Sequence, residues 1–247
     1  MNFIDQTALE KLEMVSFNET DHDIFHAIVK GAHALITDRM DPKFARYLIG
    51  HSKRMVPFQE QLLIANDVPP EIARERSEDM LMHDIGKGHV MQLPYWKITA
   101  EKPLKDEFVK DQQNKHGELG PVVLKTVMDD LGLTMENLSH ALQKKLRFSE
   151  VTMISHHAPY NVGMDIFNAC SCVTDSIDGQ LKTLSQIPPE DQPAEVIHSL
   201  RLAAIEKLRG DKYAGLYMPG LLDKAVDVTN ILKPANQSLG LEINRSP

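Results

Sequence analysis

The sequence MHDIGKG, residues 82–88, closes a run of apolar residues with helical spacing and sets a histidine beside an aspartate. Imidazole and carboxylate groups are common ligands of divalent transition ions, and the glycines let the backbone turn at the end of a helix. His83-Asp84 alone is weak evidence for a metal site, because a surface pair at a helix C-terminus could have the same sequence. The segment predicts a metal site only if other ligands converge on it.

Helical periodicity continues on both sides of this segment. Residues 42–66 predict the clearest helix, with Pro42 in its first turn and an apolar stripe that contains His51. A second helix opens at Pro69-Pro70 and ends at His83-Asp84. Two adjacent helices would therefore deliver His51 and the His-Asp pair to one place.

The remaining elements that we expect are also helices. They cover residues 5–15, 21–38 with Asp21 as the N-cap, a helix from about Leu104 that breaks near residues 115–120, 134–157 with Thr134 as the N-cap, 162–177, 193–205 and 219–231. Residues 88–103 predict an irregular loop in which Tyr95 and Trp96 would cover the body of the protein. No segment has the alternation of a strand, so the sequence predicts an all-α fold.

Composition limits the classes of partner and compartment. The chain has 247 residues, 42% of them hydrophobic and 25% charged, which suffices for one large core or two smaller ones. Its net charge of -8 argues against a general nucleic-acid or membrane-surface binder. No signal peptide or membrane-spanning run is evident, and Cys170 and Cys172 are spaced so that they cannot pair on a helix. We expect a soluble cytoplasmic protein.

Further candidate ligands follow along the chain. His116 lies at a glycine-flanked break where an ion could approach closely, and His156-His157 ends a helix before Pro159. Asp175 lies within a largely apolar helix, where a carboxylate must be paired or bind a cation. The complete candidate set is His51, His83, Asp84, His116, His156, His157 and Asp175. Five imidazoles and two carboxylates suit two divalent transition ions that share Asp84.

Another histidine pair receives the opposite interpretation. His22 and His26 have the i, i+4 spacing that could chelate a metal on one helix face. No carboxylate accompanies them in a recognisable pattern, and histidine is common on half-exposed helices. We therefore expect these two residues to be surface side chains.

The order of the candidate ligands resembles the HD superfamily of metal-dependent phosphohydrolases, and within it the HD-GYP type. That family has His…His-Asp…His…His-His…Asp, and this chain matches it element by element. The resemblance extends to HSKRMV at residues 51–56, HDIGK at 83–87, KHGELG at 115–120 and VTDSID at 173–178. It implies an HD-type helical bundle over residues 42–232, preceded by a helical extension at 1–41 and followed by a tail at 233–247.

The chain also departs from the HD-GYP pattern. The double histidine lacks the family's glutamate and Gly-Tyr-Pro loop, and only 18 positions separate His157 from Asp175. Cyclic di-GMP specificity is therefore not implied. Members with a third metal carry a glutamate where this chain has Tyr47, and His116 is followed by glycine where the family has proline. We expect two metal ions.

The resemblance implies the hydrolysis of a small phosphoester, which could be a nucleotide, a cyclic nucleotide or a cyclic dinucleotide. A hydroxide bridging two metal ions would attack phosphorus, with Asp84 shared between the ions. Lys87 would neutralise phosphate charge, although a cation favoured by a helix C-terminus would have the same sequence position. Asp178 would not bind a metal ion itself but would orient one of the residues that do. Iron or manganese is the first expectation for the metal, with nickel, zinc or magnesium as alternatives.

Two other function classes remain open. One is a non-catalytic regulatory module of the HDOD type, a related all-α fold that has lost its ligands. All seven ligand positions are filled here, which counts against it. The other is oxidative chemistry at a di-iron centre, which some members of the superfamily perform and which the ligand set allows.

Overall fold

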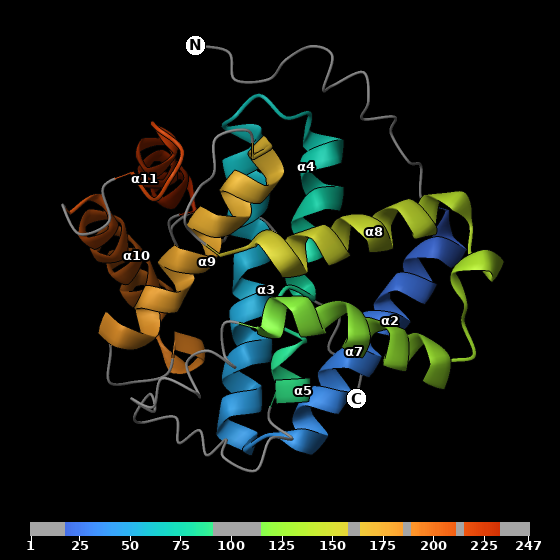
Figure 1. Ribbon diagram of the computed structural model, residues 1–247. Coiled ribbons are helices and arrows are strands. Elements are labelled where there is room, and N and C mark those ends of the chain that lie inside the picture. Colours follow the sequence, from blue (N-terminus) through green and yellow to red (C-terminus); the bar gives the residue numbers. More distant parts are fainter. Residues whose placement is uncertain (1–17, 91–114, 158–163, 185–188, 211–214, 233–247) are drawn as a thin grey trace.

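The computed structural model describes residues 18–90, 115–157, 164–184, 189–210 and 215–232 (Figure 1). Every regular element in these ranges is helical, so the predicted all-α fold is confirmed. The α-helices are α2 (Glu19–Arg39), α3 (Pro42–Ile64), α4 (Pro70–Ser77), α5 (Lys87–Val90), α7 (His116–Asp130), α8 (His140–Ser155), α9 (Ile166–Leu184), α10 (Ala194–Arg209) and α11 (Leu221–Ile231). Three 3₁₀ helices are η1 (Glu78–Leu81), η2 (Met135–Asn137) and η3 (Pro189–Asp191).

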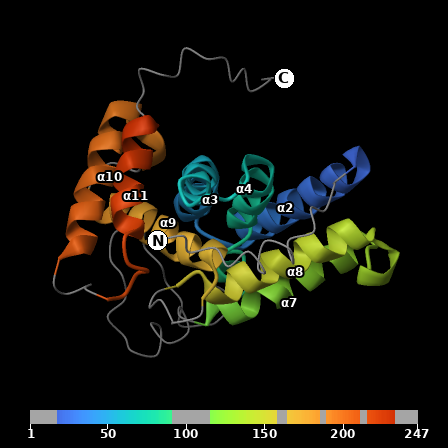
Figure 2. The same ribbon diagram turned by 90° about the horizontal axis from the view of Figure 1, so that it is seen from above.

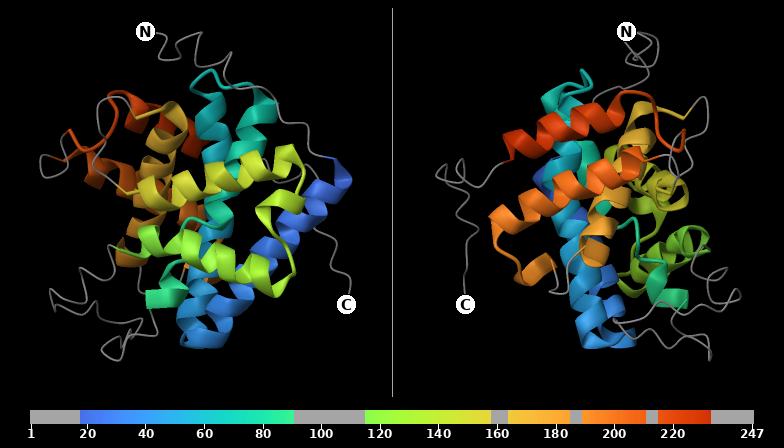
Figure 3. Two further views of the ribbon diagram at one scale, coloured as in Figure 1. Left: turned by 45° about the vertical axis from the view of Figure 1, so that its right-hand side comes forward. Right: turned by 90° about the vertical axis from the view of Figure 1, so that its left-hand side faces the viewer.

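Helix α3 runs through the middle of the molecule. Helices α9, α10 and α11 lie on one side of it, and α2, α7 and α8 lie on the other (Figures 1 and 2). The views in Figure 3 show the same division, with α10 and α11 together at the outer face. The fold therefore consists of two helical layers, one on each side of the shared central helix α3.

Two apolar cores correspond to these two sides. The first half of α3 supplies Phe44 and Leu48 to a core with α2, α7 and α8. Its second half supplies Phe58 and Leu62 to a core with α9, α10 and α11. His51 lies on α3 between these two sets, where it is 3% exposed. A polar side chain at that depth must be paired, because leaving it unpaired in an apolar surrounding costs several kcal/mol, on the order of 2–7.

The predicted N-cap of the first described helix is wrong. Helix α2 begins two residues earlier than expected, and Asn18 is its N-cap. The Asn18 side-chain oxygen accepts the backbone N–H of Asp21 at 2.9 Å. Asp21 instead lies in the first turn, and Asn and Asp are about equally good N-caps, so local sequence could not separate them.

The helix expected over residues 134–157 is divided in two. Thr134 is the cap of the short helix η2, where Asn137 accepts the Thr134 backbone N–H at 2.9 Å. Helix α8 begins only at His140, and the Ser139 hydroxyl accepts the Leu142 N–H at 3.1 Å. Two capping residues five apart thus start two helices in succession.

The remaining expected helices are present with shifted ends, and α9 begins at Ile166. Three predictions fall outside the described residues. They are the helix at residues 5–15, the helix start near Leu104, and the covering position of Tyr95 and Trp96. Within the described ranges, no helix is both long and apolar enough to cross a membrane.

Candidate metal centre

Helix α3 carries His51 into the centre of the molecule. Its Nδ1–H donates to Asp178 Oδ2 at 2.7 Å, and Tyr47, one turn earlier, stacks on the ring with planes 9° apart. Because a carboxylate can only accept, Nδ1 of His51 carries a proton. The Nε2 atom of His51 faces away from Asp178 and into the centre.

The sequence predicted that His83 and Asp84 end an α-helix. In the structure they lie in a turn instead. Helix α4 stops at Ser77, and η1 leads into the turn at residues 82–86. The His83 Nδ1–H donates to the Met80 carbonyl at 2.8 Å, which leaves Nε2 facing inward. Both side chains are buried, at 0% and 2% exposure.

Gly86 brings this turn against the start of α7. A Cβ atom at position 86 would lie 1.8 Å from the His116 carbonyl oxygen and 2.7 Å from the Gly120 nitrogen. Only a residue without a side chain permits this backbone contact. The contact sets His116 beside His83-Asp84.

Helices α7 and α8 supply the other three histidines. The expected break near residues 115–120 is instead the start of α7 at His116, and the helix continues through Gly117 and Gly120. Cβ atoms on these two glycines would lie 2.6 and 2.8 Å from atoms of Met153 on α8. The glycines therefore serve close helix packing, which brings His116 to the end of α8.

His156 and His157 follow directly after α8. His156 is the C-cap residue and its Nδ1–H donates to the Met153 carbonyl at 2.8 Å. The chain leaves the helix at this point, so both rings turn toward His116. The His116 Nε2 lies 3.2 Å from His156 Nε2 and 3.1 Å from His157 Nε2.

Helix α9 contributes two aspartates one turn apart. Asp175 Oδ1 lies 3.1 Å from His51 Nε2 and 3.6 Å from His83 Nε2. Its other oxygen lies 3.6 Å from His157 Nδ1. The side chain of Asp175 thus lies between His51 and His83 on one side and His157 on the other.

The structure brings together all seven residues predicted as metal ligands. His51, His83 and Asp84 form one group whose ligand atoms lie within 4.8 Å of one another, and His116, His156 and His157 form another. We call them the first and second ligand groups. Asp84 joins them: its Oδ2 lies 3.3 Å from His83 Nε2, while its Oδ1 lies 2.9 Å from His116 Nε2.

The hydrogen-bonding state of the centre suits a bound cation. The Nε2 atoms of His51 and His83 lie 3.3 Å apart, and Asp175 Oδ1 lies 3.1 Å from the first and 3.6 Å from the second. Two imidazole nitrogens and a carboxylate oxygen thus lie within a few ångströms of one another. Asp84 Oδ1 is buried, and the Nε2 atoms of His116 and His156 lie 2.9 and 3.6 Å from it. Imidazole nitrogens and carboxylate oxygens are a donor set for divalent transition ions, so these residues could hold such ions.

The pKa values of the histidines differ between the two groups. Burial lowers the pKa of His83, but the charge of Asp84 and the Asp175 carboxylate outweigh it and raise the value to about 9. Burial and the neighbouring His156 lower the pKa of His157 to about 4. Burial also opposes ionisation of Asp84, but His83 and Lys87 hold its pKa well below the usual range. In the first ligand group the Asp84 anion favours a positive charge nearby. In the second group the His157 imidazole is neutral at pH 7.

Lys87 lies at the edge of the centre. It is the first residue of α5 and its ammonium group pairs with Asp84 Oδ2, so it does not cap a helix C-terminus. The Lys87 side chain is 22% exposed, and that of His157 is 43% exposed. These two side chains mark the side on which the centre reaches solvent.

Arg54 is a member of the centre that sequence reasoning did not assign. Its Nε and Nη2 donate to the two oxygens of Asp178 at 3.2 and 2.9 Å. Arg201 on α10 donates in turn to the Arg54 carbonyl at 3.4 Å. The position three residues after His51, on the same helix face, was the only available signal. Arg54 fixes the carboxylate that orients His51.

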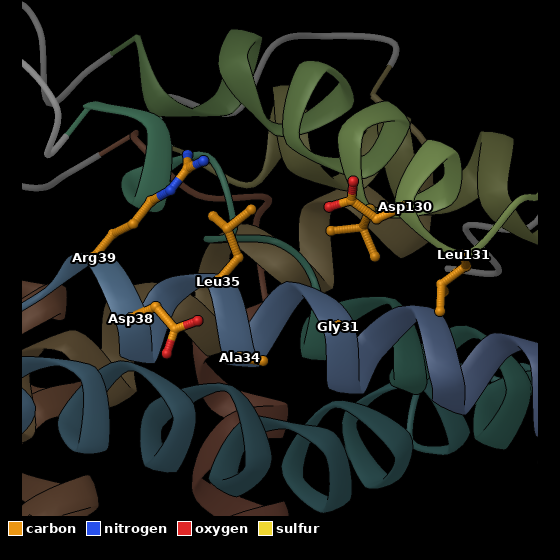
Figure 4. A pocket seen from close by; sticks show the side chains of 8 residues that line it. Gly31, Ala34, Leu35, Asp38, Arg39, Asp130 and Leu131 are labelled. Atoms are coloured by element: carbon orange, nitrogen blue, oxygen red, sulfur yellow. The ribbon is translucent and has the colours of Figure 1, made fainter.

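A separate groove lies between α2 and α7 (Figure 4). It has a volume of about 340 Å³, and its lining includes Asp38, Arg39 and Asp130 but no residue of either ligand group. Figure 4 shows Asp38 and Arg39 on α2 and Asp130 on α7. Two carboxylates against one guanidinium disfavour an anionic ligand in this groove.

Comparison with known proteins adds no relative. Neither a protein-family model nor a curated protein sequence matches the chain. The interpretation of the centre therefore depends on its own residues and geometry.

Proposed function

We propose that the chain is an HD-type phosphohydrolase that cleaves a small phosphoester at a centre for two metal ions. The observation that carries the proposal is the position of Asp84, whose two oxygens face different ligand groups at 3.3 and 2.9 Å from the nearest imidazole nitrogens. A carboxylate in that position can serve two ions at once. Two ions about 3.5–4 Å apart are the usual arrangement for displacement at phosphorus.

Bound ions would supply an activated water and would polarise the phosphate oxygens. The protein's own residues have complementary tasks. Lys87 can neutralise charge on the phosphate, because its flexible side chain lies at the solvent side of the centre. Asp178 and Arg54 hold the His51 ring so that Nε2 stays free of a proton. The partly exposed His157 lies where a substrate would enter.

The metal and the compartment belong to the same proposal. Nitrogen and oxygen donors fit iron or manganese first, and nickel, zinc or magnesium as alternatives. Cys170 and Cys172 are both buried free thiols, which fits a reducing compartment such as the cytoplasm. The substrate would be a nucleotide, a cyclic nucleotide or a cyclic dinucleotide.

Elemental analysis of the purified protein is the first test. We expect the wild type to hold about two equivalents of transition metal more than His83→Ala does. Loss should be as complete in Asp84→Ala, which removes the shared carboxylate, and turnover of phosphoesters should disappear with the metal. His140→Ala, at an exposed histidine outside both ligand groups, is the matched control and should keep full metal content.

Three results would contradict the proposal in different ways. A fully metallated and fully active Asp84→Ala protein would refute the assignment of the site. No bound metal after reconstitution would favour the regulatory module, in which the histidines are structural. Bound iron with oxygen consumption and no phosphoester hydrolysis would favour oxidative chemistry.

A further inference from the structure

A second group of candidate ligands lies outside the buried centre. It consists of His22 and His26 on α2 and Glu78 at the start of η1, and their ligand atoms lie within 4.8 Å of one another. The two histidines are exposed, and Glu78 is partly exposed. The carboxylate that the sequence pattern lacked is thus supplied by a segment more than fifty residues away.

The geometry of α2 explains how these groups meet. On a helix with 3.6 residues per turn, positions 22, 26 and 33 fall within about 40° of one another, so all three histidines share a face. That face meets η1, because the His33 Nε2–H donates to the carbonyl of Leu81 at 2.9 Å. Leu81 ends η1 and Glu78 begins it. The same 3₁₀ helix therefore contacts α2 near His33 and again near His26.

The rings of His22 and His26 are arranged as a chelating pair. Their planes are 15° apart and their centroids 6.2 Å apart, so they stand side by side on successive turns. Histidines at i and i+4 on one helix face can bind a single ion together. With a glutamate as the third ligand, they form the two-histidine, one-carboxylate set that zinc accepts with a fourth position left for water.

We infer that His22, His26 and Glu78 form a binding site for one Zn²⁺ ion on the surface of the protein, separate from the buried centre. Glu19, seven residues before His26 and so on the same face of α2, adds negative charge to this end of the helix. A bound ion links α2 to η1 in addition to the bond from His33. Because η1 leads into the turn that carries His83, the ion stabilises the segment on which the buried centre depends.

Zinc content after equilibrium dialysis tests this site. Wild type should retain about one equivalent more than His22→Ala or His26→Ala, because two of three protein ligands cannot hold zinc as tightly. Glu78→Gln keeps the shape of the side chain but removes its charge, and it should lose the same equivalent. His140→Ala, at an exposed histidine remote in sequence from this group, should behave as wild type.

The same comparison in a His83→Ala background separates this site from the proposed function. The difference of about one equivalent should persist there, because the surface ligands do not depend on the buried centre. A thermal scan gives a second readout: saturating zinc should raise the unfolding midpoint of His83→Ala by about 5–10 °C, and that of His83→Ala/His26→Ala by much less. Equal zinc content with and without His26 would overturn the inference, whatever the buried centre does.

Discussion

Asp178 shows how a residue outside the two ligand groups can orient a candidate metal ligand. Its carboxylate accepts the His51 Nδ1–H at 2.7 Å and is held by Arg54. Burial opposes its ionisation, but the hydrogen bond and charge of His51, together with Arg54, keep its pKa below the usual value. Asp178 is therefore an anion that fixes the tautomer of His51.

The first prediction concerns this pair. Asp178→Asn should lower metal affinity about 10–100-fold, because an amide holds the His51 proton less firmly and leaves Arg54 with a weaker partner. Metal titration with circular dichroism as a check on folding would measure it. Asp191→Asn, which removes one exposed carboxylate paired with Arg46, is the control and should change nothing. Unchanged affinity in Asp178→Asn would show that Asp178 does not orient His51.

The second prediction concerns Cys172. Burial, followed by the charge of Asp175, raises the pKa of its thiol to about 12 from a usual 9.0. Between about pH 9 and pH 12, the Cys172 thiol keeps its proton in the folded protein but loses it in the unfolded chain. The free energy of unfolding should therefore fall as the pH rises from about 9 toward about 12. Alkylation at pH 9 should be slow in the folded protein and fast in urea, and rapid labelling without urea would contradict this.

Among the elements, the turn at residues 82–86 depends on one glycine. Gly86→Ala would bring a Cβ atom within 1.8 Å of the His116 carbonyl, so backbone must move. We expect a loss of about 3 kcal/mol in the free energy of unfolding, the upper end of the range for overpacking, together with reduced metal content. Urea unfolding measures the first and elemental analysis the second.

Gly179, on helix α9, offers a matched control. It lies within α9, where an added Cβ atom would meet nothing within 4 Å. Gly179→Ala should therefore stabilise the protein by about 0.5–1 kcal/mol, as glycine is a poor residue in a helix interior. If both substitutions had the same effect, close contact at Gly86 would not be the cause.

The segment η1 is fixed to α8 by a buried ion pair. Lys145 and Asp79 lie 2.9 Å apart at 0% and 1% side-chain exposure, and the Ser149 hydroxyl donates to the same carboxylate at 2.8 Å. Lys145 also donates to the carbonyl of Glu75. These contacts hold η1 and α8, the elements that precede His83 and His156.

Lys145→Met should cost about 3 kcal/mol of stability, the lower end of the range for breaking a buried pair, because the Asp79 carboxylate keeps the more distant Arg76 guanidinium, at 3.4 Å, as its cationic partner. The control is Lys125→Met, which removes a surface pair with Asp129 whose side chains are 75% and 57% exposed. That change should cost at most about 1 kcal/mol. Equal effects in urea unfolding would show that the buried pair contributes no more than the surface pair.

At the scale of the whole molecule, the buried centre joins the two helical layers. Its candidate ligands come from α3, the turn after η1, α7, the end of α8, and α9. The first core contains α7 and α8, and the second contains α9. An ion held by these side chains would connect the two cores through their shared helix.

Removal of metal should therefore destabilise the entire fold. A ligand present at about 100 times its dissociation constant contributes about 2.7 kcal/mol, which corresponds to about 5–10 °C in the unfolding midpoint of a chain of this size. We expect the midpoint to fall by that amount after dialysis against a chelator and to recover when metal is returned. In a His26→Ala background, which lacks the surface site, Asp84→Asn should respond far less to the chelator, and an equal response would place the stabilising ion elsewhere.

The sequence alone determined the helical class and named the candidate ligands. Apolar residues three and four apart mark α3 through local periodicity, and the structure confirms that helix almost to its ends. The candidate ligands from His51 to Asp175 could be found from residue type and order, because metal-binding groups are few in kind. The N-cap at Asn18 and the division before α8 were missed, since several capping residues compete locally.

Tertiary structure alone decided which of these groups meet and how. The two oxygens of Asp84 face different histidines because Gly86 allows the turn to touch α7. Glu78 joins His22 and His26 because η1 packs along α2. Each of these contacts joins segments far apart in the sequence, and distances of a few ångströms across helices depend on how side chains pack. Local periodicity contains no information about that packing.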